Sequence, residues 1–220
     1  MSDRTTGVTA SLTAGFTLIE LMVVTAIMVL ITMVVLFNTG RFNSSVLLRS
    51  LAYEVGLSLR TAQLYGVSVR EATSGDFNAA YGVFFPVSII NVPNASYSLF
   101  ADLNNNGIFD DGTSAIEENF LLQNSFAISD ICATTGSSMI CAAGCPSPLP
   151  AGITSCAPQS IATGITISFK RPNPNALIIV DSNTSQPYAG AIITVSSPAG
   201  STRTTSVTST GLITVQGEAQ

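Results

Sequence analysis

Residues 16–37 read FTLIELMVVTAIMVLITMVVLF, and this stretch decides how the chain is organised. Only Thr17, Glu20, Thr25 and Thr32 among its 22 residues are not apolar. As a helix rising about 1.5 Å per residue, the stretch would be roughly 33 Å long, enough to cross a hydrocarbon core of about 30 Å. Threonine hydroxyls in such a helix can bond back to carbonyls of the helix itself. The sequence therefore predicts a membrane-spanning helix.

The composition of the chain excludes several classes of protein. Of its 220 residues, 46% are hydrophobic and only 10% are charged, against about a quarter charged in ordinary soluble domains. Mean hydropathy is +0.46. The chain has no histidine, so a Ser-His-Asp triad and a His-ligated zinc site are impossible. The net charge of −5 argues against nucleic-acid binding, and no nucleotide or nucleophile motif occurs, so we expect neither an enzyme nor an organic cofactor.

The apolar stretch differs from a secretory signal peptide and from a plain anchor. A signal peptide has an apolar run of about 7–15 residues followed by a small-residue cleavage site. Here the run is longer, residues 38–41 form no such site, and the small residues come before the run, at 13–15. A plain anchor leaves Glu20 unexplained, because an ionised carboxylate in a membrane costs about 2.5–3.5 kcal/mol and is usually functional.

Residues 15–20 read GFTLIE and lead directly into the apolar helix. This order, with Gly15, Phe16 and Glu20 at fixed spacings before a spanning segment, resembles the processing site of type IV pilins and type II secretion pseudopilins. The resemblance implies that a membrane-embedded prepilin peptidase cuts after Gly15 on the cytoplasmic side and then methylates the new amino terminus at Phe16. It also implies that the apolar helix is retained and becomes the core of a filament.

Glu20 has a physical role under this resemblance, because the cut would create a positively charged amine on Phe16. A lone charge is costly in a lipid-like core, so we expect Glu20 of a neighbouring subunit to pair with that amine. Charges in a low dielectric attract strongly and tolerate little misplacement, so the pair would set the axial register between helices. The alternative is that Glu20 lies at the membrane surface and faces headgroup water.

Residues 38–66 are expected to continue the helix with an amphipathic pattern. Apolar residues recur there at spacings of three and four, while the charged residues fall elsewhere. The apolar positions are Leu48, Leu51, Ala52, Val55, Leu59 and Ala62. Such a stripe must be buried against something, and we expect a sheet. Gly66 is the expected stop.

Residues 67–220 are expected to form a β-rich head. Runs of β-branched and aromatic residues, separated by Pro, Gly and Asn turn signals, predict strands. They lie at 81–85, 97–100, 165–170, 177–180, 191–195, 202–207 and 212–215, with a hairpin turn between the strands at 191–195 and 202–207. The predicted fold class is α+β: a long N-terminal helix, with a spanning half and an amphipathic half, packed on a mostly antiparallel β-sheet head. The predicted segments are a leader at 1–15, the spanning helix at 16–37, its continuation at 38–66 and the head at 67–220.

Two regions resemble, within the pilin-like group, the minor pseudopilins and minor pilins of the FimT and general-secretion H type. One is the helix end at 59–63 leading to the strand at 81–83. The other is the terminal hairpin at 200–207 and 210–215. Residues 86–164 match no pattern of this group.

Residues 102–112 read DLNNNGIFDDG and place oxygen-bearing side chains at alternate positions before a glycine. This is the first half of a calcium loop, with ligands at positions 1, 3 and 5, a turn glycine at 6 and a backbone carbonyl at 7. The candidate ligands are Asp102, Asn104, Asn106, Ile108 and Asp110. Thr113 stands where an EF-hand has a bidentate glutamate, so Asp111, Glu117 or Glu118 would have to supply a further carboxylate. Bound calcium would order the loop; the alternative is a turn held by Asn and Asp side chains alone.

The four cysteines, Cys132, Cys141, Cys145 and Cys156, lie within 25 residues and allow three disulfide pairings. Disulfides are favoured if the head lies outside the cytoplasm, as the helix implies. A Cys₄ zinc site is the alternative, but it usually shows two C-x₂₋₄-C units, and only the pair at 141 and 145 has that spacing. We therefore expect two disulfides of undetermined pairing.

The residues and the resemblance together predict a structural subunit, a minor pilin or pseudopilin, of a type IV pilus or a type II secretion pseudopilus. The expected partners are other such subunits, the prepilin peptidase and the inner membrane. The expected location is the bacterial inner membrane, crossed once, with the head in the periplasm or on an extracellular filament. The rival is a singly anchored extracytoplasmic binding domain, including one that captures DNA through Lys170, Arg171 and Arg203.

Overall fold

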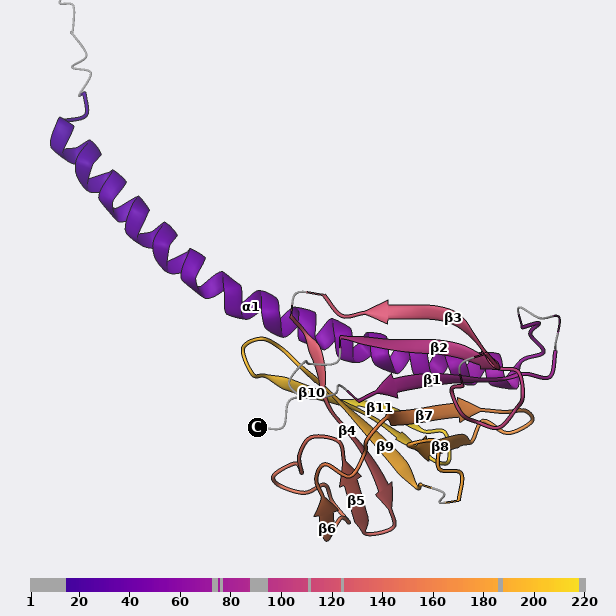
Figure 1. Ribbon diagram of the computed structural model, residues 1–220. Coiled ribbons are helices and arrows are strands. Elements are labelled where there is room, and N and C mark those ends of the chain that lie inside the picture. The colour runs from indigo at the N-terminus through magenta and orange to yellow at the C-terminus, as the bar shows by residue number, and fades with distance from the viewer. Residues whose placement is uncertain are drawn as a thin grey trace, which may run out of the picture. The chain divides into compact units, whose positions relative to one another are not determined.

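The computed structural model describes residues 15–72, 75, 77–87, 95–110, 112–123, 125–185 and 188–217, without the side chains of 37–43. The described chain forms one α-helix, α1 (Leu18–Val67), and eleven β-strands (Figure 1). Contacts within the chain divide it into two compact units, residues 1–42 and 43–220. The predicted leader lies outside the described residues except for Gly15.

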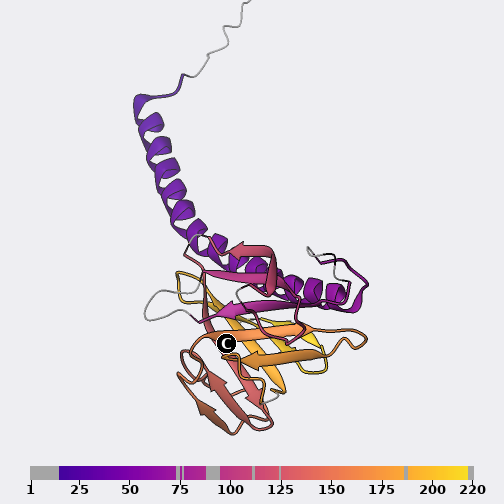
Figure 2. The ribbon, with the colours of Figure 1, turned by 45° about the vertical axis from the view of Figure 1, so that its right-hand side comes forward.

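All eleven strands belong to the second unit, the head. They are β1 (Ala80–Pro86), β2 (Ser96–Asp102), β3 (Ser114–Leu121), β4 (Ala127–Thr135), β5 (Ser138–Cys141), β6 (Ser155–Ala157), β7 (Gly164–Phe169), β8 (Ala176–Val180), β9 (Gly190–Ser196), β10 (Thr202–Thr208) and β11 (Ile213–Gln216). A five-stranded sheet has the order β3-β2-β1-β7-β8, and a six-stranded sheet has the order β11-β10-β9-β4-β5-β6. All neighbours are antiparallel except β5 and β6 (Figure 2). The α+β class with mostly antiparallel strands is confirmed.

Each of the seven predicted strands corresponds to one observed strand: β1, β2, β7, β8, β9, β10 or β11. The predicted hairpin turn is also present, because Ser196 pairs with Thr202 and the turn closes through Ser197 N–H donating to Ser201 O at 2.9 Å. The strands β3, β4, β5 and β6 were not predicted. They lie within residues 86–164, which match no pattern of the pilin-like group.

The part of α1 inside the head carries the predicted apolar stripe. Leu48, Ala52, Val55, Leu59 and Ala62 are all buried, and Leu51 is partly buried. The helix ends at Val67, one residue beyond the expected stop at Gly66. Gly66 is needed for a different reason: the backbone of Phe169 passes so close that an added Cβ would lie 2.8 Å from its carbonyl carbon.

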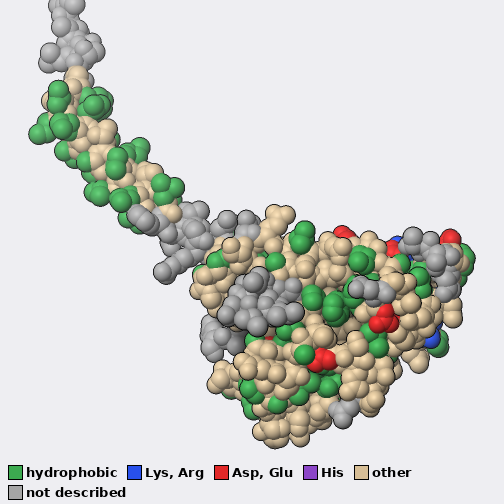
Figure 3. Space-filling view, viewed as in Figure 1, with side chains coloured by type: hydrophobic (Ala, Val, Ile, Leu, Met, Phe, Trp, Pro, Cys, Tyr) green, Lys and Arg blue, Asp and Glu red, His purple; other side chains and the backbone are tan. Residues whose placement is uncertain are grey.

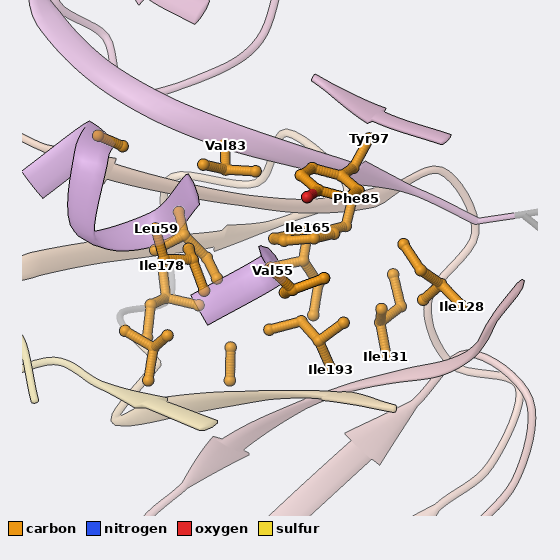
Figure 4. Close-up of a cluster of buried hydrophobic side chains, with 14 of the residues drawn as sticks. Val55, Leu59, Val83, Phe85, Tyr97, Ile128, Ile131, Ile165, Ile178 and Ile193 are labelled. Atoms are coloured by element: carbon orange, nitrogen blue, oxygen red, sulfur yellow. The ribbon is translucent and has the colours of Figure 1, made fainter. Parts of the chain in front are cut away.

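This part of the helix contacts both sheets of the head. Figure 4 shows Val55 and Leu59 among side chains of the five-stranded sheet, such as Ile165, and of the six-stranded sheet, such as Ile193. Fully burying an aliphatic side chain of this size contributes about 1.5–3 kcal/mol. Polar contacts fix the same segment: Thr205 Oγ1 donates to Ala52 O at 3.1 Å, on the side of the six-stranded sheet.

The outer face of the five-stranded sheet is covered by the loop that joins β2 to β3. The Phe109 ring in this loop stacks on Phe84 of β1 at 4.9 Å and meets Phe100 of β2 edge-on at 5.2 Å. Further along the sheet, Ser168 Oγ donates to Gly107 O at 3.4 Å. The loop is therefore packed against three adjacent strands.

Candidate functional site

The start of α1 carries the three residues of the candidate processing and assembly site. Gly15, Phe16 and Thr17 precede the helix, and the Phe16 side chain is 88% exposed. The Thr17 N–H and Oγ1 each donate to Glu20 Oε2 at 3.0 Å, and Glu20 N–H donates to Thr17 Oγ1 at 3.4 Å. This reciprocal pair is a capping box, which satisfies N–H groups that a helix start otherwise leaves unpaired.

The capping box was missed in the sequence, although its T-x-x-E spacing is readable at residues 17–20. It holds the Glu20 carboxylate against the residue that follows Phe16. The candidate cleavage bond, between Gly15 and Phe16, lies in exposed chain just ahead of that cap. The structure thus brings the three residues together at one helix end.

The segment Leu18–Leu36 is apolar apart from Glu20, Thr25 and Thr32. It is long and apolar enough to cross a membrane, with a mean hydropathy of 2.7, and none of it is buried inside the described structure. Figure 3 shows hydrophobic side chains exposed along this segment. Its two internal threonines do not interrupt it, because Thr25 Oγ1 donates to Met22 O at 3.0 Å and Thr32 Oγ1 donates to Met28 O at 2.7 Å. Such a helix can serve as a single membrane anchor or as a signal sequence.

The cysteines form two disulfides, Cys132–Cys141 and Cys145–Cys156. The prediction of disulfides is confirmed. The register of β4 and β5 explains the first disulfide, because it places Cys132 directly opposite Cys141. Asp130 approaches the first pair, but these sulfurs are bonded to each other and none of the four cysteines is free. A Cys₄ zinc site is therefore incompatible with this arrangement.

Asp130 anchors the chain that links the two disulfides. Its Oδ1 accepts from Ala143 N–H at 2.8 Å, and its Oδ2 accepts from Gly144 N–H at 3.2 Å. Burial raises the pKa of the Asp130 carboxyl above its ordinary value, and the backbone N–H groups act in the opposite direction. Both oxygens have protein partners, so this carboxylate is a structural anchor.

The predicted calcium ligands lie in the loop between β2 and β3. Asp102 is the last residue of β2, Gly107 has the positive φ of +80° that the turn requires, and Asp110 lies near the return to β3. Burial raises the pKa of the Asp102 carboxyl, and the nearby N–H groups of Gly107, Asn105 and Asn106 oppose this. This loop is on the five-stranded sheet and the cysteines are on the six-stranded sheet, so the two sets form separate sites.

The three residues considered as a source of a further carboxylate ligand for calcium differ in their surroundings. Glu117 is paired with Arg70, whose Nη2 lies 2.7 Å from Glu117 Oε2 and whose guanidinium stacks 3.8 Å above the Tyr65 ring. Glu118 is exposed on the edge strand β3. Asp111 lies outside the described residues. Of these three carboxylates, Glu117 therefore already forms a salt bridge, with the Arg70 guanidinium.

Asp181 is a further structural carboxylate that the sequence did not reveal. Asp181 Oδ1 accepts from the N–H groups of Thr163 at 2.7 Å and Gly164 at 3.2 Å, and Oδ2 accepts from Ala162 N–H at 2.9 Å. Burial acts to raise the pKa of Asp181, but the donors outweigh it and hold the pKa below its ordinary value of 3.8. The signal was weak because Asp181 reads as an ordinary turn residue.

Of the three basic residues considered for DNA capture, Arg171 is engaged inside the head. It donates to the backbone carbonyls of Ser68 and Phe77 and so fixes the chain that leaves α1.

Comparison with known proteins finds no matching family model, curated protein or solved structure.

Proposed function

We propose that the chain is a structural subunit, a minor pilin or pseudopilin, of a type IV pilus or a type II secretion pseudopilus. One observation carries the proposal: the membrane-length segment Leu18–Leu36, none of which is buried, directly follows Gly15, Phe16 and Thr17, carries Glu20 in its first turn, and precedes a head that forms its own compact unit. A helix of this kind needs an apolar environment, which either lipid or other copies of the helix can provide.

Processing would convert the helix start into a charged site. Hydrolysis of the peptide bond between Gly15 and Phe16 places a carboxylate on the released leader and an amine on Phe16. The amine then lies four residues before Glu20, next to Thr17, whose capping contacts hold the Glu20 carboxylate at the helix start. Methylation leaves the amine basic, so it keeps its positive charge.

Glu20 would then act between subunits. A carboxylate and an amine that enter a low-dielectric bundle together are far less costly than either alone. The pair would be made only at one axial offset of neighbouring helices, so it would select the register, while close packing of the apolar side chains would hold the helices together. In the single chain Glu20 accepts from Thr17, which keeps the carboxylate at the end where the neighbour's amine would lie.

The disulfides support a head outside the cytoplasm, because such bonds form and persist in oxidising compartments. The proposed location is therefore the bacterial inner membrane, crossed once, with the head in the periplasm or on the assembled filament. The leader would remain on the cytoplasmic side.

The test compares Glu20→Ala with Glu54→Ala, an exposed acid on the head part of the same helix. Both variants should remain in the carbonate-resistant membrane fraction. Glu20→Ala should be lost from the sheared or pelleted filament fraction, while Glu54→Ala should be incorporated like the wild type.

Normal incorporation of Glu20→Ala would contradict the role of this carboxylate in assembly. Absence of the wild-type chain from filaments under conditions where the secretion or pilus apparatus is assembled would favour the anchored binding domain instead.

A further inference from the structure

Asp102 holds a buried carboxylate oxygen that has no hydrogen-bond partner among the described residues. The residue is 0% exposed, and its Oδ2 accepts from Gly107 N–H at 2.7 Å. Its Oδ1 is buried with no hydrogen-bond partner within the described part of the chain. Folded proteins rarely leave a buried carboxylate oxygen without a partner, because desolvation of the charge is then uncompensated. A cation inside the loop would compensate it.

Other oxygen atoms of the loop are arranged around the same turn. Asn104 Oδ1 accepts from Asn106 N–H at 3.1 Å, and Asn106 Oδ1 accepts from Ile108 N–H at 2.8 Å. Each amide oxygen has a second lone pair that remains able to bind a cation. Asn106 Nδ2 donates to Asp110 Oδ2 at 2.6 Å, which brings a second carboxylate to the loop.

We propose that the loop between β2 and β3 binds a calcium ion through Asp102 Oδ1, the side-chain oxygens of Asn104, Asn106 and Asp110, and the carbonyl oxygen of Ile108. The ligand set contains oxygen only, which selects a hard cation over zinc or copper. Calcium accepts six to eight oxygens, including neutral amides and water, in flexible geometry. Magnesium demands a near-ideal octahedron and gives up its water reluctantly, so this amide-rich loop suits it less well.

The ion would fasten the loop onto the outer face of the five-stranded sheet. Phe109 and Gly107, which pack against Phe84 and Ser168, lie between the proposed ligands. Gly107 cannot be replaced easily, because an added Cβ would lie 3.1 Å from Ile179 Cδ1 and its φ is +80°. Holding the ligands in place therefore also holds the aromatic and backbone contacts that cover the sheet.

The affinity should be modest. The described ligand set has two carboxylates, Asp102 and Asp110, and Thr113 occupies the position where an EF-hand supplies a bidentate glutamate. Glu117 is held by Arg70. We expect a dissociation constant of about 10⁻⁴–10⁻³ M, the range of extracellular calcium modules. Such a site would be filled outside the cell and empty in the cytoplasm, whether or not the chain assembles into filaments.

The experiment titrates the full-length, detergent-solubilised chain with calcium and with magnesium after treatment with a chelator. About 10 mM calcium should raise the melting temperature of the head by roughly 4–8 °C, and the same concentration of magnesium should raise it clearly less. No shift with calcium, or an equal shift with magnesium, would overturn the proposal.

Three variants locate the site. Asp102→Asn should lose the calcium-dependent shift, while Asp130→Asn, whose two oxygens both have backbone donors, should keep it. Because Asp102→Asn can also loosen the loop by itself, Asn104→Asp tests the opposite direction. Its added carboxylate should lower the dissociation constant about tenfold, measured by calorimetry. An unchanged affinity in Asn104→Asp, or an undiminished shift in Asp102→Asn, would overturn the assignment.

Discussion

The two units of the chain differ in how far their large aliphatic side chains are buried. In the head, a core of leucines and isoleucines such as Leu59 and Ile193 is buried between two sheets and a helix; in residues 18–36, every leucine and isoleucine is at least half exposed. The head contains the partners that its apolar surface needs, and the N-terminal half of α1 does not. The head can therefore bury its apolar core by folding alone, whereas the apolar helix can remove its side chains from water only with lipid or with other helices around it.

Shortening one leucine in each unit should give the largest difference in stability between the two units. Leu59→Ala removes a side chain that is 0% exposed and should lower the free energy of unfolding of the head by about 2–5 kcal/mol, because it leaves a cavity. Leu30→Ala, at a side chain that is 64% exposed, should change it by less than about 0.5 kcal/mol. Denaturant unfolding in detergent measures both, and equal losses would mean that the two units are not separate.

The disulfides should give the next largest effect, again confined to the head. They close loops with sequence separations of 9 and 11, so each should contribute about 2–3 kcal/mol by restricting the unfolded chain. The double variant Cys132→Ala/Cys141→Ala should lose more than Cys145→Ala/Cys156→Ala, because the first pair is buried and its removal also leaves a void. Thermal unfolding with and without reductant compares the two double variants; a larger loss in Cys145→Ala/Cys156→Ala would refute this ranking.

Asp181 should give the smallest effect and make the head sensitive to acid. Its folded pKa is depressed, so the stability it contributes is complete above about pH 4 and is lost as the pH falls through the folded value. Asp181→Asn tolerates the same positive φ of 52° but should lower stability at neutral pH by about 1–2 kcal/mol. The gap between variant and wild type should close in acid; a gap independent of pH would show that the charge is not what the N–H donors recognise.

The sequence predicted seven strands because each combines β-branched or aromatic residues with a clear turn signal. It missed β3, an edge strand whose residues Glu117, Glu118 and Asn119 give no apolar alternation, and whose pairing with β2 shifts register between Leu99 and Phe100. It also missed β6, which has three residues and pairs parallel to β5. Short or polar strands are specified by their neighbours more than by their own residues.

The candidate sites also combine features that are visible in the local sequence with features that depend on distant contacts. The spacing of Gly15, Phe16 and Glu20 and the alternation from Asp102 to Asp110 are local, so the sequence displays them. Asp102 is fully buried only in the folded head, and Cys132 lies opposite Cys141 only when β4 and β5 pair in register. Properties that depend on distant contacts could not be predicted from local pattern.

The central claim is that the apolar helix enters the membrane as a precursor and becomes an assembly element after processing. The most direct test is the intact mass and amino-terminal sequence of the mature chain isolated from its own cells. The expected result is a chain that begins at Phe16 and carries one methyl group on its amine. A mature chain that still begins at Met1, or one cut after the apolar segment as a secretory signal would be, would contradict it.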